Sequence, residues 1–253
     1  MLDTRTLQNY LNRSDPTVTL RLAPQTVPDQ KVIMAIKVLL TGATGMVGEG
    51  VLHECLNHPD VSSVLVLGRR PCGVTHPKIR EIVHGDLFDL TSIQDELTGY
   101  QACFFCLGVS SMGKTEEEFR RLTHTLTLHV GEVLSRRNPG MAFCYISGAG
   151  TDSSEKGKVM WARVKGKTEN DLRELPFKAV YAFRPGMLKP TKGLKNALKL
   201  YAYFGWVYPI LRWLAPSTAC TLSELGLAMI HAVTRESPKA TVEVSDIVDL
   251  AKP

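Results

Sequence analysis

Short apolar runs alternate with longer segments of mixed polarity through most of the chain. The run at 36–41 is apolar apart from its lysine and terminal threonine and leads into a glycine-rich turn. After the turn, Val47, Val51, Leu52 and Cys55 recur at the spacing of one helical face. The pattern therefore predicts a strand, a loop and a helix in that order.

The same alternation continues to about residue 186. Thr115, followed three residues later by Glu118, is a capping-box signature that opens the longest predicted helix. Strands with nearly continuous apolar character, separated by helices, favour a parallel sheet covered on both faces. The predicted fold class is α/β, a doubly wound parallel Rossmann sheet. Strands are expected at 36–41, 62–68, 79–85, 101–108, 141–148 and 177–186, and helices at 46–58, 92–99, 115–137 and 156–174.

The rhythm changes after residue 186. A helix from about Gly193 leads into an aromatic segment, a capped helix runs from Thr221 to about Thr234, and "ATVEVSD" predicts a short final strand. We expect a small, mainly helical C-terminal lobe from about residue 187. Residues 1–33 have no periodic apolar pattern, so they are expected to form a loosely ordered extension to a folded domain at 34–253.

Composition fits one soluble α/β domain. The chain has 253 residues, of which 44% are hydrophobic and 22% are charged. Its net charge of +5 comes from acidic and basic residues mixed along the sequence, so no nucleic-acid partner is expected. The six cysteines form no spaced framework and indicate a reducing, cytoplasmic compartment. Cys103 and Cys106 form a C-x-x-C, but their strand-like context favours core residues over a redox or metal pair.

The segment "TGATGMVG" carries the strongest chemical signal. Gly42, Gly45 and Gly48 stand between the first strand and the first helix. Glycines there permit a tight turn, a close approach of the backbone to a pyrophosphate and close packing of helix on strand. The helix N-terminus then offers free N–H groups to phosphates. In this context the pattern predicts a dinucleotide site rather than a structural turn alone.

The end of the second strand indicates which dinucleotide binds. NAD-binding proteins usually place a carboxylate there for the ribose 2′-OH, whereas an arginine suits the 2′-phosphate of NADP. In "LVLGRR" the positions are Arg69 and Arg70, with no acid. The alternative is a pair of solvated surface arginines. We predict NADP(H) as the cofactor, and no metal.

With these motifs the chain resembles the short-chain dehydrogenase/reductase superfamily, in its extended and atypical branch. The resemblance rests on "TGATGMVG", "HGDLFD", "LGVS", the region of Lys165 and "FRPG". It is similar in particular to Tat-interacting oxidoreductase-like proteins, through "FFCLG", "VKGK" and "RPG", and it covers about residues 36–234.

The resemblance implies roles for individual positions. Ser147 falls where the family has its active-site hydroxyl, and Lys165 where a lysine binds the nicotinamide ribose and lowers the pKa of the catalytic tyrosine. The other cofactor-binding residues that it and the nucleotide motifs imply are Thr41, Gly42, Thr44, Gly45, Met46, Val47, Gly48, Arg69, Arg70, Asp86, Leu87, Cys106, Leu107, Gly108, Pro185 and Gly186.

The tyrosine of the family's Tyr-x-x-x-Lys motif is replaced by Trp161. Residues four apart share a helical face, so Trp161 stands where a phenol would act. An indole N–H donates a hydrogen bond but does not exchange a proton near neutral pH. An alternative is that Trp161 and Lys165 are a core aromatic and a surface lysine on an amphipathic helix.

The segment 200–214 concentrates aromatic residues after several lysines. It is too short, and too interrupted by Pro209 and Arg212, for a membrane span. It is expected to form a wall of the substrate pocket, with attachment to a membrane surface or a dimer contact as alternatives. The partner would be an apolar small-molecule substrate, and the protein a monomer or homodimer.

Two functions are consistent with these residues. One is an NADP(H)-binding oxidoreductase or epimerase-like enzyme with a non-standard active site. The other is a non-catalytic protein that senses NADPH and binds a partner or membrane. Ser147 and Lys165 favour the first, whereas Trp161 favours the second.

Overall fold

The computed structural model describes residues 35–196, 208 and 215–253. The predicted extension at 1–33 lies outside the described residues, as does the aromatic segment 200–214 apart from Tyr208. The boundaries predicted for the extension and the lobe therefore stay predictions. None of the helices in the described ranges is long and apolar enough to cross a bilayer.

The described residues form a parallel sheet in the order β3-β2-β1-β4-β5-β6-β9. The strand order reverses between β1 and β4, which is the crevice where α/β sheets bind ligands. The predicted Rossmann fold class is confirmed. The strands are β1 (Ile36–Thr41), β2 (Val61–Gly68), β3 (Ile79–Val83), β4 (Ala102–Phe105), β5 (Ala142–Ile146), β6 (Ala179–Phe183) and β9 (Thr241–Val242).

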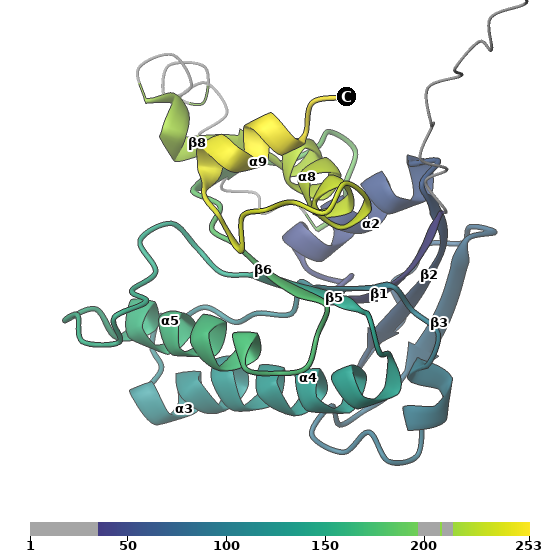
Figure 1. The fold of residues 1–253 in the computed structure, drawn as a ribbon, viewed down its shortest axis with the longest axis horizontal. Helices are drawn as coiled ribbons and strands as arrows, with labels where there is room; N and C mark the ends of the chain where they lie inside the picture. Colours follow the sequence, from purple (N-terminus) through teal and green to yellow (C-terminus); the bar gives the residue numbers. More distant parts are fainter. Residues whose placement is uncertain (1–34, 197–207, 209–214) are drawn as a thin grey trace, which may run out of the picture. The chain divides into compact units, whose positions relative to one another are not determined.

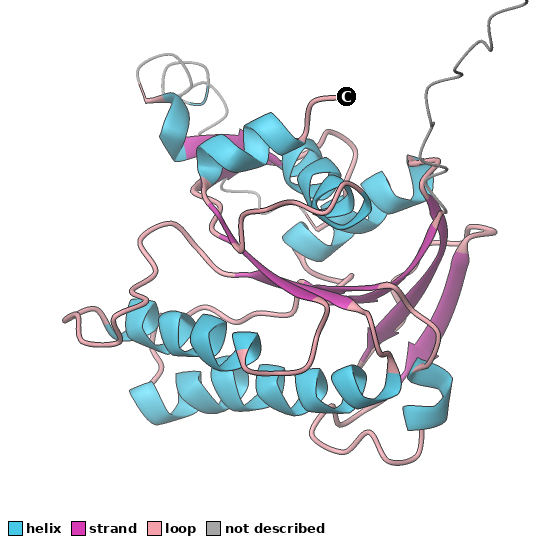
Figure 2. Ribbon diagram, in the orientation of Figure 1, coloured by secondary structure: helices cyan, strands magenta, loops and turns pink. Residues whose placement is uncertain are grey.

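Helices cover both faces of this sheet (Figures 1 and 2). On one face lie α2 (Met46–Asn57) and α8 (Leu222–Thr234), with α9 (Val244–Leu250) against α8. The opposite face carries α3 (Glu116–Arg120), the π-helical turn η2 (Arg121–Thr125), α4 (Leu126–Arg137), α5 (Met160–Arg173) and the 3-10 turn η1 (Gln94–Leu97).

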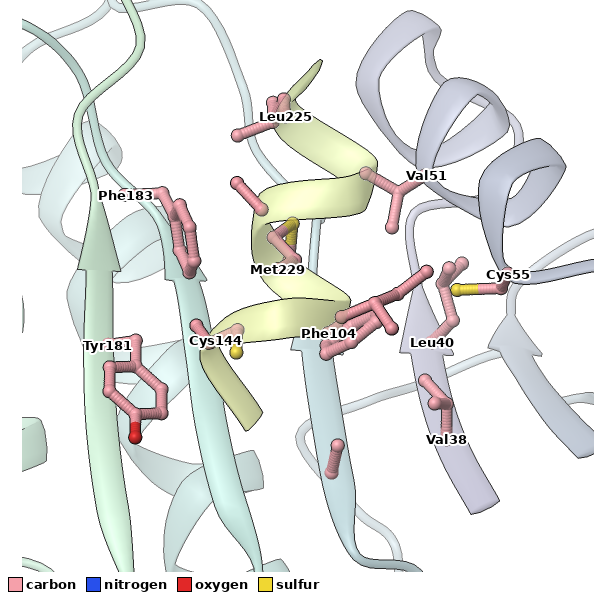
Figure 3. Close-up of a cluster of buried hydrophobic side chains, with 14 of the residues drawn as sticks. Val38, Leu40, Val51, Cys55, Phe104, Cys144, Tyr181, Phe183, Leu225 and Met229 are labelled. Atoms are coloured by element: carbon pink, nitrogen blue, oxygen red, sulfur yellow. The ribbon is translucent and has the colours of Figure 1, made fainter. Parts of the chain in front are cut away.

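The sheet separates two apolar layers. Figure 3 shows the first, where Leu225 and Met229 of α8 and Val51 of α2 lie over Phe104 and Phe183 of the strands. The second layer joins alternate strand residues to α4 and α5. Because successive strand residues face opposite ways, Cys103 is buried in the second layer, whereas Cys106 packs against the first. All six cysteines are free.

The described part of the C-terminal region contributes to a small separate sheet and to the main sheet. A small parallel sheet joins β7 (Met187–Lys189) to β8 (Ala219–Thr221), and the 3-10 turn η3 (Pro216–Thr218) precedes β8. By contrast, α8 and β9 complete the layers of the main sheet.

The predicted final strand is present as β9, but the sequence pattern did not reveal the helix after it. The N-cap of α9 is Glu243, whose side chain and that of Asp246 form a reciprocal capping box. Only seven residues long, α9 is too short for its apolar periodicity to stand out.

The predicted helix at 156–174 begins later than expected, at Met160. The preceding residues are held in a loop by the Asp152 carboxylate, which accepts hydrogen bonds from the backbone N–H of Ser154 (3.0 Å) and Gly157 (2.6 Å). These local bonds compete with helix formation, as those of aspartate commonly do.

Candidate active site

All six strands from β1 to β6 point their carboxyl ends to one edge of the sheet, because every pairing among them is parallel. The predicted site residues follow these strand ends in the sequence. The fold therefore brings together loops that are more than 100 residues apart in the chain.

The glycine turn after β1 leaves no room for side chains at two positions. Gly42 has a φ of +78°, and a Cβ there would lie 2.6 Å from the carbonyl oxygen of Cys106. A Cβ at Gly48 would lie 2.1 Å from the carbonyl oxygen of Gly42. Gly45 is the N-cap of α2 and is exposed. The turn thus presents the N-terminus of α2 at the strand edge, where it can hold a phosphate.

One cavity adjoins this turn, and a second, larger cavity shares Arg69 and Leu107 with it. The smaller, of ≈ 50 Å³, is lined by Gly42, Ala43, Thr44, Val66, Gly68, Arg69, Arg70 and Leu107. The larger, of ≈ 150 Å³, is lined by Arg69, Gly85, Asp86, Leu87, Phe88, Leu107, Gly108, Val109, Leu122 and Leu126. Their shared residues place the glycine turn, the arginine pair and the Asp86 loop around one continuous site.

Sequence reasoning missed Leu122 and Leu126 in the larger cavity. They belong to η2 and the start of α4, where a π-helical turn interrupts the predicted long helix. Their i, i+4 spacing predicts that both side chains lie on one helical face. The spacing does not indicate that this face borders a cavity.

Some predicted cofactor residues do not line either cavity. Thr41 is fully buried, and its hydroxyl makes no hydrogen bond within the described part of the chain. Met46, Val47 and Cys106 pack partly buried against the core layer beneath α2 and α8.

Lys165 reaches from α5 to the end of β5. Its Nζ donates hydrogen bonds to the carbonyl oxygens of Ile146 (3.1 Å) and Ser147 (3.0 Å) and lies 5.5 Å from the centre of the Tyr145 ring. Burial lowers the pKa of Lys165 to about 8, and the negative charge of Glu169 opposes that shift. A pKa of about 8 means that Lys165 begins to lose its proton slightly above neutral pH.

Ser147 is buried at the same strand end, with its Oγ 2.9 Å from Oγ1 of Thr151. Thr151 donates its own hydroxyl hydrogen to the carbonyl oxygen of Gly148 at 2.8 Å. Each hydroxyl has a single hydrogen, so Ser147 is the donor to Thr151. In this arrangement the Ser147 oxygen offers lone pairs, and not a proton, to a ligand.

Trp161 lies one helical turn before Lys165 on α5. A Cβ added at Gly148 or at Gly150 would be 3.8 Å from its six-membered ring, so the indole packs over the turn that follows Ser147. Trp161 therefore contacts the turn after Ser147, and its indole N–H is not an acid near neutral pH.

Gly166, the residue after Lys165, stands where the structure leaves no room for a side chain. A Cβ at Gly166 would lie 1.9 Å from the carbonyl oxygen of Asp152, because the loop before α5 crosses the helix at that point. The N–H of Asp152 also donates to the carbonyl oxygen of Ala162 at 3.1 Å. This crossing fixes the Ser147 loop against the helix that carries Lys165.

The loop after β6 runs beside the Ser147 turn. The N–H of Ala149 donates to the carbonyl oxygen of Pro185 at 2.9 Å, and the N–H of Ser147 donates to that of Phe183 at 2.7 Å. A Cβ at Gly186 would lie 2.1 Å from the carbonyl oxygen of Thr218. The structure thus joins Ser147, Lys165 and Pro185 at one end of the edge.

The sequence profile of the NAD dependent epimerase/dehydratase family matches residues 38–159, from β1 to the start of α5. Residues 38–159 are therefore similar to this family. Together the matches support an NAD(P)-binding, oxidoreductase-like protein, in agreement with the resemblance to extended short-chain dehydrogenases.

Two family relatives show how far the similarity extends. "Protein fmp52-1, mitochondrial" of Aspergillus terreus is 25% identical over 235 residues, which cover 85% of this chain and 98% of the relative. "Protein HTATIP2" of Rattus norvegicus is 27% identical over 154 residues, covering 60% of this chain and 62% of the relative.

Two solved structures share the fold. The Bordetella bronchiseptica enzyme WbmG, in complex with NAD, superposes with a TM-score of 0.62 and 12% identity over 89% of this chain and 79% of that one. The UDP-N-acetylglucosamine 4-epimerase of Bacillus cereus gives 0.59 and 15% identity over 82% and 76%.

Proposed function

We propose that the protein is an NADP(H)-dependent oxidoreductase of the epimerase/dehydratase family, acting on an apolar carbonyl or alcohol by a route that does not use tyrosine. The observation that carries the cofactor choice is the small cavity beside the glycine turn. Arg69 and Arg70 line it, and among its described lining residues there is no carboxylate. Two guanidinium groups suit a 2′-phosphate, which NADPH has and NADH lacks.

Calorimetric titration with NADPH and NADH tests the cofactor. We expect NADPH to bind more tightly, and Arg69→Ala/Arg70→Ala to weaken NADPH binding by roughly 10- to 100-fold with little effect on NADH. Arg136→Ala, an exposed arginine in the last turn of α4, is the matched control and should change neither. Tighter binding of NADH would overturn the assignment, as would failure of both to bind.

The bound cofactor would supply the hydride, and the residues of the chain would position the reactants. The N-terminus of α2 and Gly42 fit the pyrophosphate, Asp86 and Leu87 the adenine, and Lys165 the nicotinamide ribose. Ser147 would accept a hydrogen bond from the reacting hydroxyl. Since Trp161 is not an acid, the proton would pass to water or to Lys165.

A second candidate function is a non-catalytic NADPH sensor. Two observations favour it: Trp161 packs over the active-site turn in place of a phenol, and the Ser147 hydrogen is committed to Thr151. Both functions require cofactor binding, so titration alone does not separate them.

A panel of aliphatic and aromatic ketones and their alcohols separates the two functions. NADPH-dependent turnover by the native protein supports the enzyme and contradicts the sensor. Turnover that appears only in Trp161→Tyr supports the sensor, because it shows that the rest of the site is competent. Trp161→Phe, which fills similar space without an acid, is the control.

Location and membrane attachment remain proposals. We propose a cytoplasmic protein, but the fungal relative carries "mitochondrial" in its name, so fractionation of tagged protein must compare the two compartments. Flotation with vesicles of anionic lipid, with and without residues 200–214, tests peripheral attachment. The idea fails if the intact chain stays unbound.

A further inference from the structure

Three side chains follow one another along a single face of α5, at intervals of one helical turn. Trp161 and Lys165 are followed by Glu169, which is completely buried, with an exposed fraction of 0%. A buried carboxylate is costly unless it is paired, so its partners define its function.

The main partner of Glu169 is Arg184, the residue between β6 and Pro185. Its guanidinium donates to both carboxylate oxygens, at 3.0 Å from Nε and 2.6 Å from Nη2. Arg173 places a second cation 3.6 Å from Oε2 of Glu169. Sequence reasoning singled out neither Glu169 nor Arg184.

Arg184 also connects the walls of the site. Its Nη2 donates to Oγ of Ser153 in the Ser147 loop at 2.5 Å, and its Nη1 lies 3.1 Å from Oε1 of Glu243, after β9. One side chain thus links α5, the loop after β5, the end of β6 and the start of α9.

We propose that the Glu169–Arg184 pair is a positioning pair that sets the charge of Lys165 as well as holding the two active-site loops together. The Nζ of Lys165 lies over the Tyr145 ring of β5 and donates to the carbonyl oxygens of Ile146 and Ser147. Glu169 stands four residues further along α5, on the same side of the helix. Burial raises the pKa of Tyr145, which keeps that ring neutral, so Glu169 is the anion that favours the ammonium form. The positive charges of Arg184 and Arg173 partly cancel the effect of Glu169 on Lys165. Glu243 contributes through its contact with Arg184.

Removing either member of the pair should shift the pKa of Lys165, in opposite directions. Glu169→Gln removes the anion, so Lys165 should lose its proton at a pH lower by about one unit. Arg184→Gln removes a cation while Arg173 still keeps Glu169 ionised, so Lys165 should lose its proton at a higher pH. A purely structural role predicts no such reversal, because loosening the site would move both variants the same way.

The test is a pH titration of protein carrying [ε-13C]lysine, followed by NMR without ligand. The resonance of Lys165 is identified by its absence in Lys165→Arg. Asp171→Asn is the matched control: it makes the same type of change as Glu169→Gln on α5, but its carboxylate faces His124 and Lys167. We expect a midpoint near 8 in the native protein and in the control, a lower one in Glu169→Gln and a higher one in Arg184→Gln.

Unchanged midpoints in both variants, or shifts of the same sign, would overturn the proposal. If Glu169→Gln does not fold, Arg184→Gln and Arg184→Lys decide it, since the lysine variant keeps the positive charge and should leave the midpoint near the native value. The charge effect does not depend on NADP(H) binding. Its consequence for the cofactor rests on the proposed function: the pH dependence of NADPH affinity should shift with the Lys165 midpoint, and absence of NADPH binding would sink only that part.

Discussion

At the residue scale, the direction of one hydrogen bond controls what Ser147 offers a ligand. Its hydrogen goes to Thr151, whose own hydrogen goes to the carbonyl oxygen of Gly148. A serine held in this way accepts a hydrogen bond from a hydroxyl but does not donate one to a carbonyl. Thr151 therefore belongs to the candidate active site, although it is not part of the sequence motif that identified Ser147.

Thr151→Val should reverse this preference. Valine keeps the shape of threonine but cannot accept the Ser147 hydrogen, which is then free for a carbonyl ligand. We expect the affinity for a ketone relative to the alcohol of the same skeleton to rise by up to roughly tenfold. Titration of the cofactor complex with 2-decanone and 2-decanol measures the ratio. Thr151→Ser should retain the native ratio, and an unchanged ratio in the valine variant would refute the assigned donor.

The family resemblance singled out Ser147, Trp161 and Lys165, because its motifs follow the fifth predicted strand and the next predicted helix. It could not supply Thr151, Glu169 or Arg184. Their importance depends on partners brought near by the fold: Arg184 is 15 residues from Glu169 and 31 from Ser153 along the chain. Nothing in the spacing of a buried glutamate and an arginine distinguishes them from solvated surface charges.

At the element scale, the loop before α5 and the helix itself meet where only glycine fits. Gly166→Ala should destabilise the protein by about 1–3 kcal/mol, because its Cβ would overlap the carbonyl of Asp152 and push the loop away. Helix propensity alone predicts the opposite, a gain of up to about 1 kcal/mol. Urea denaturation measures the difference. Gly85→Ala, where the space is open and φ is not positive, is the control and should lie within about 0.5 kcal/mol of native.

The sequence predicted the ends of helices and strands well where a regular apolar pattern ran through the whole element. It failed where local hydrogen bonds or a π-helical turn interrupted the helix. The strand β1 and helix α8 agree with their predicted ranges to within one residue. The pattern of apolar residues did not reveal the π-helical turn η2. A π-helical turn differs from an α-helical turn by one residue, and over only five residues that difference hardly changes the spacing of apolar positions. Yet that turn carries Leu122 into the larger cavity.

At the scale of the whole molecule, cofactor binding should stabilise the fold, since the site joins loops after β1, β2, β3 and β4. At about 100 times its dissociation constant, NADPH should contribute about 2.7 kcal/mol and raise Tm by roughly 5–10 °C. NADH at the same concentration should raise it less. Thermal denaturation measures both shifts, and equal or reversed shifts would count against the NADP(H) proposal.

Acid should weaken the packing of α2 against α8. The His58 ring lies 5.3 Å from that of His231, edge to face. Burial lowers the pKa of His58, with the charges of His231, Lys78 and Arg235 acting in the same direction and Asp60 opposing them. The unfolded chain therefore binds the proton more readily than the folded one, so the stabilisation is present above about pH 6.5 and is lost as the pH falls below it.

Thermal denaturation between pH 5 and 8 measures this loss. The native protein should lose more stability below pH 6.5 than His58→Gln, which cannot take up the proton. His53→Gln, at an exposed histidine on the same helix, should follow the native curve. Parallel curves for native protein and His58→Gln would show that His58 does not contribute.

The sequence by itself determined the alternation of strands and helices, the glycine turn before α2, the arginines after β2 and the four-residue spacing of Trp161 and Lys165. These features depend on neighbours within a few turns or strands of the chain, so periodicity and spacing reveal them. Only the tertiary structure decided that α8 and β9 complete the Rossmann layers, that Leu122 and Leu126 line the larger cavity, that Ser147 donates to Thr151, and that Glu169 is buried against Arg184. Each of these depends on which distant segments the sheet brings together and on which polar groups burial then forces to find a partner.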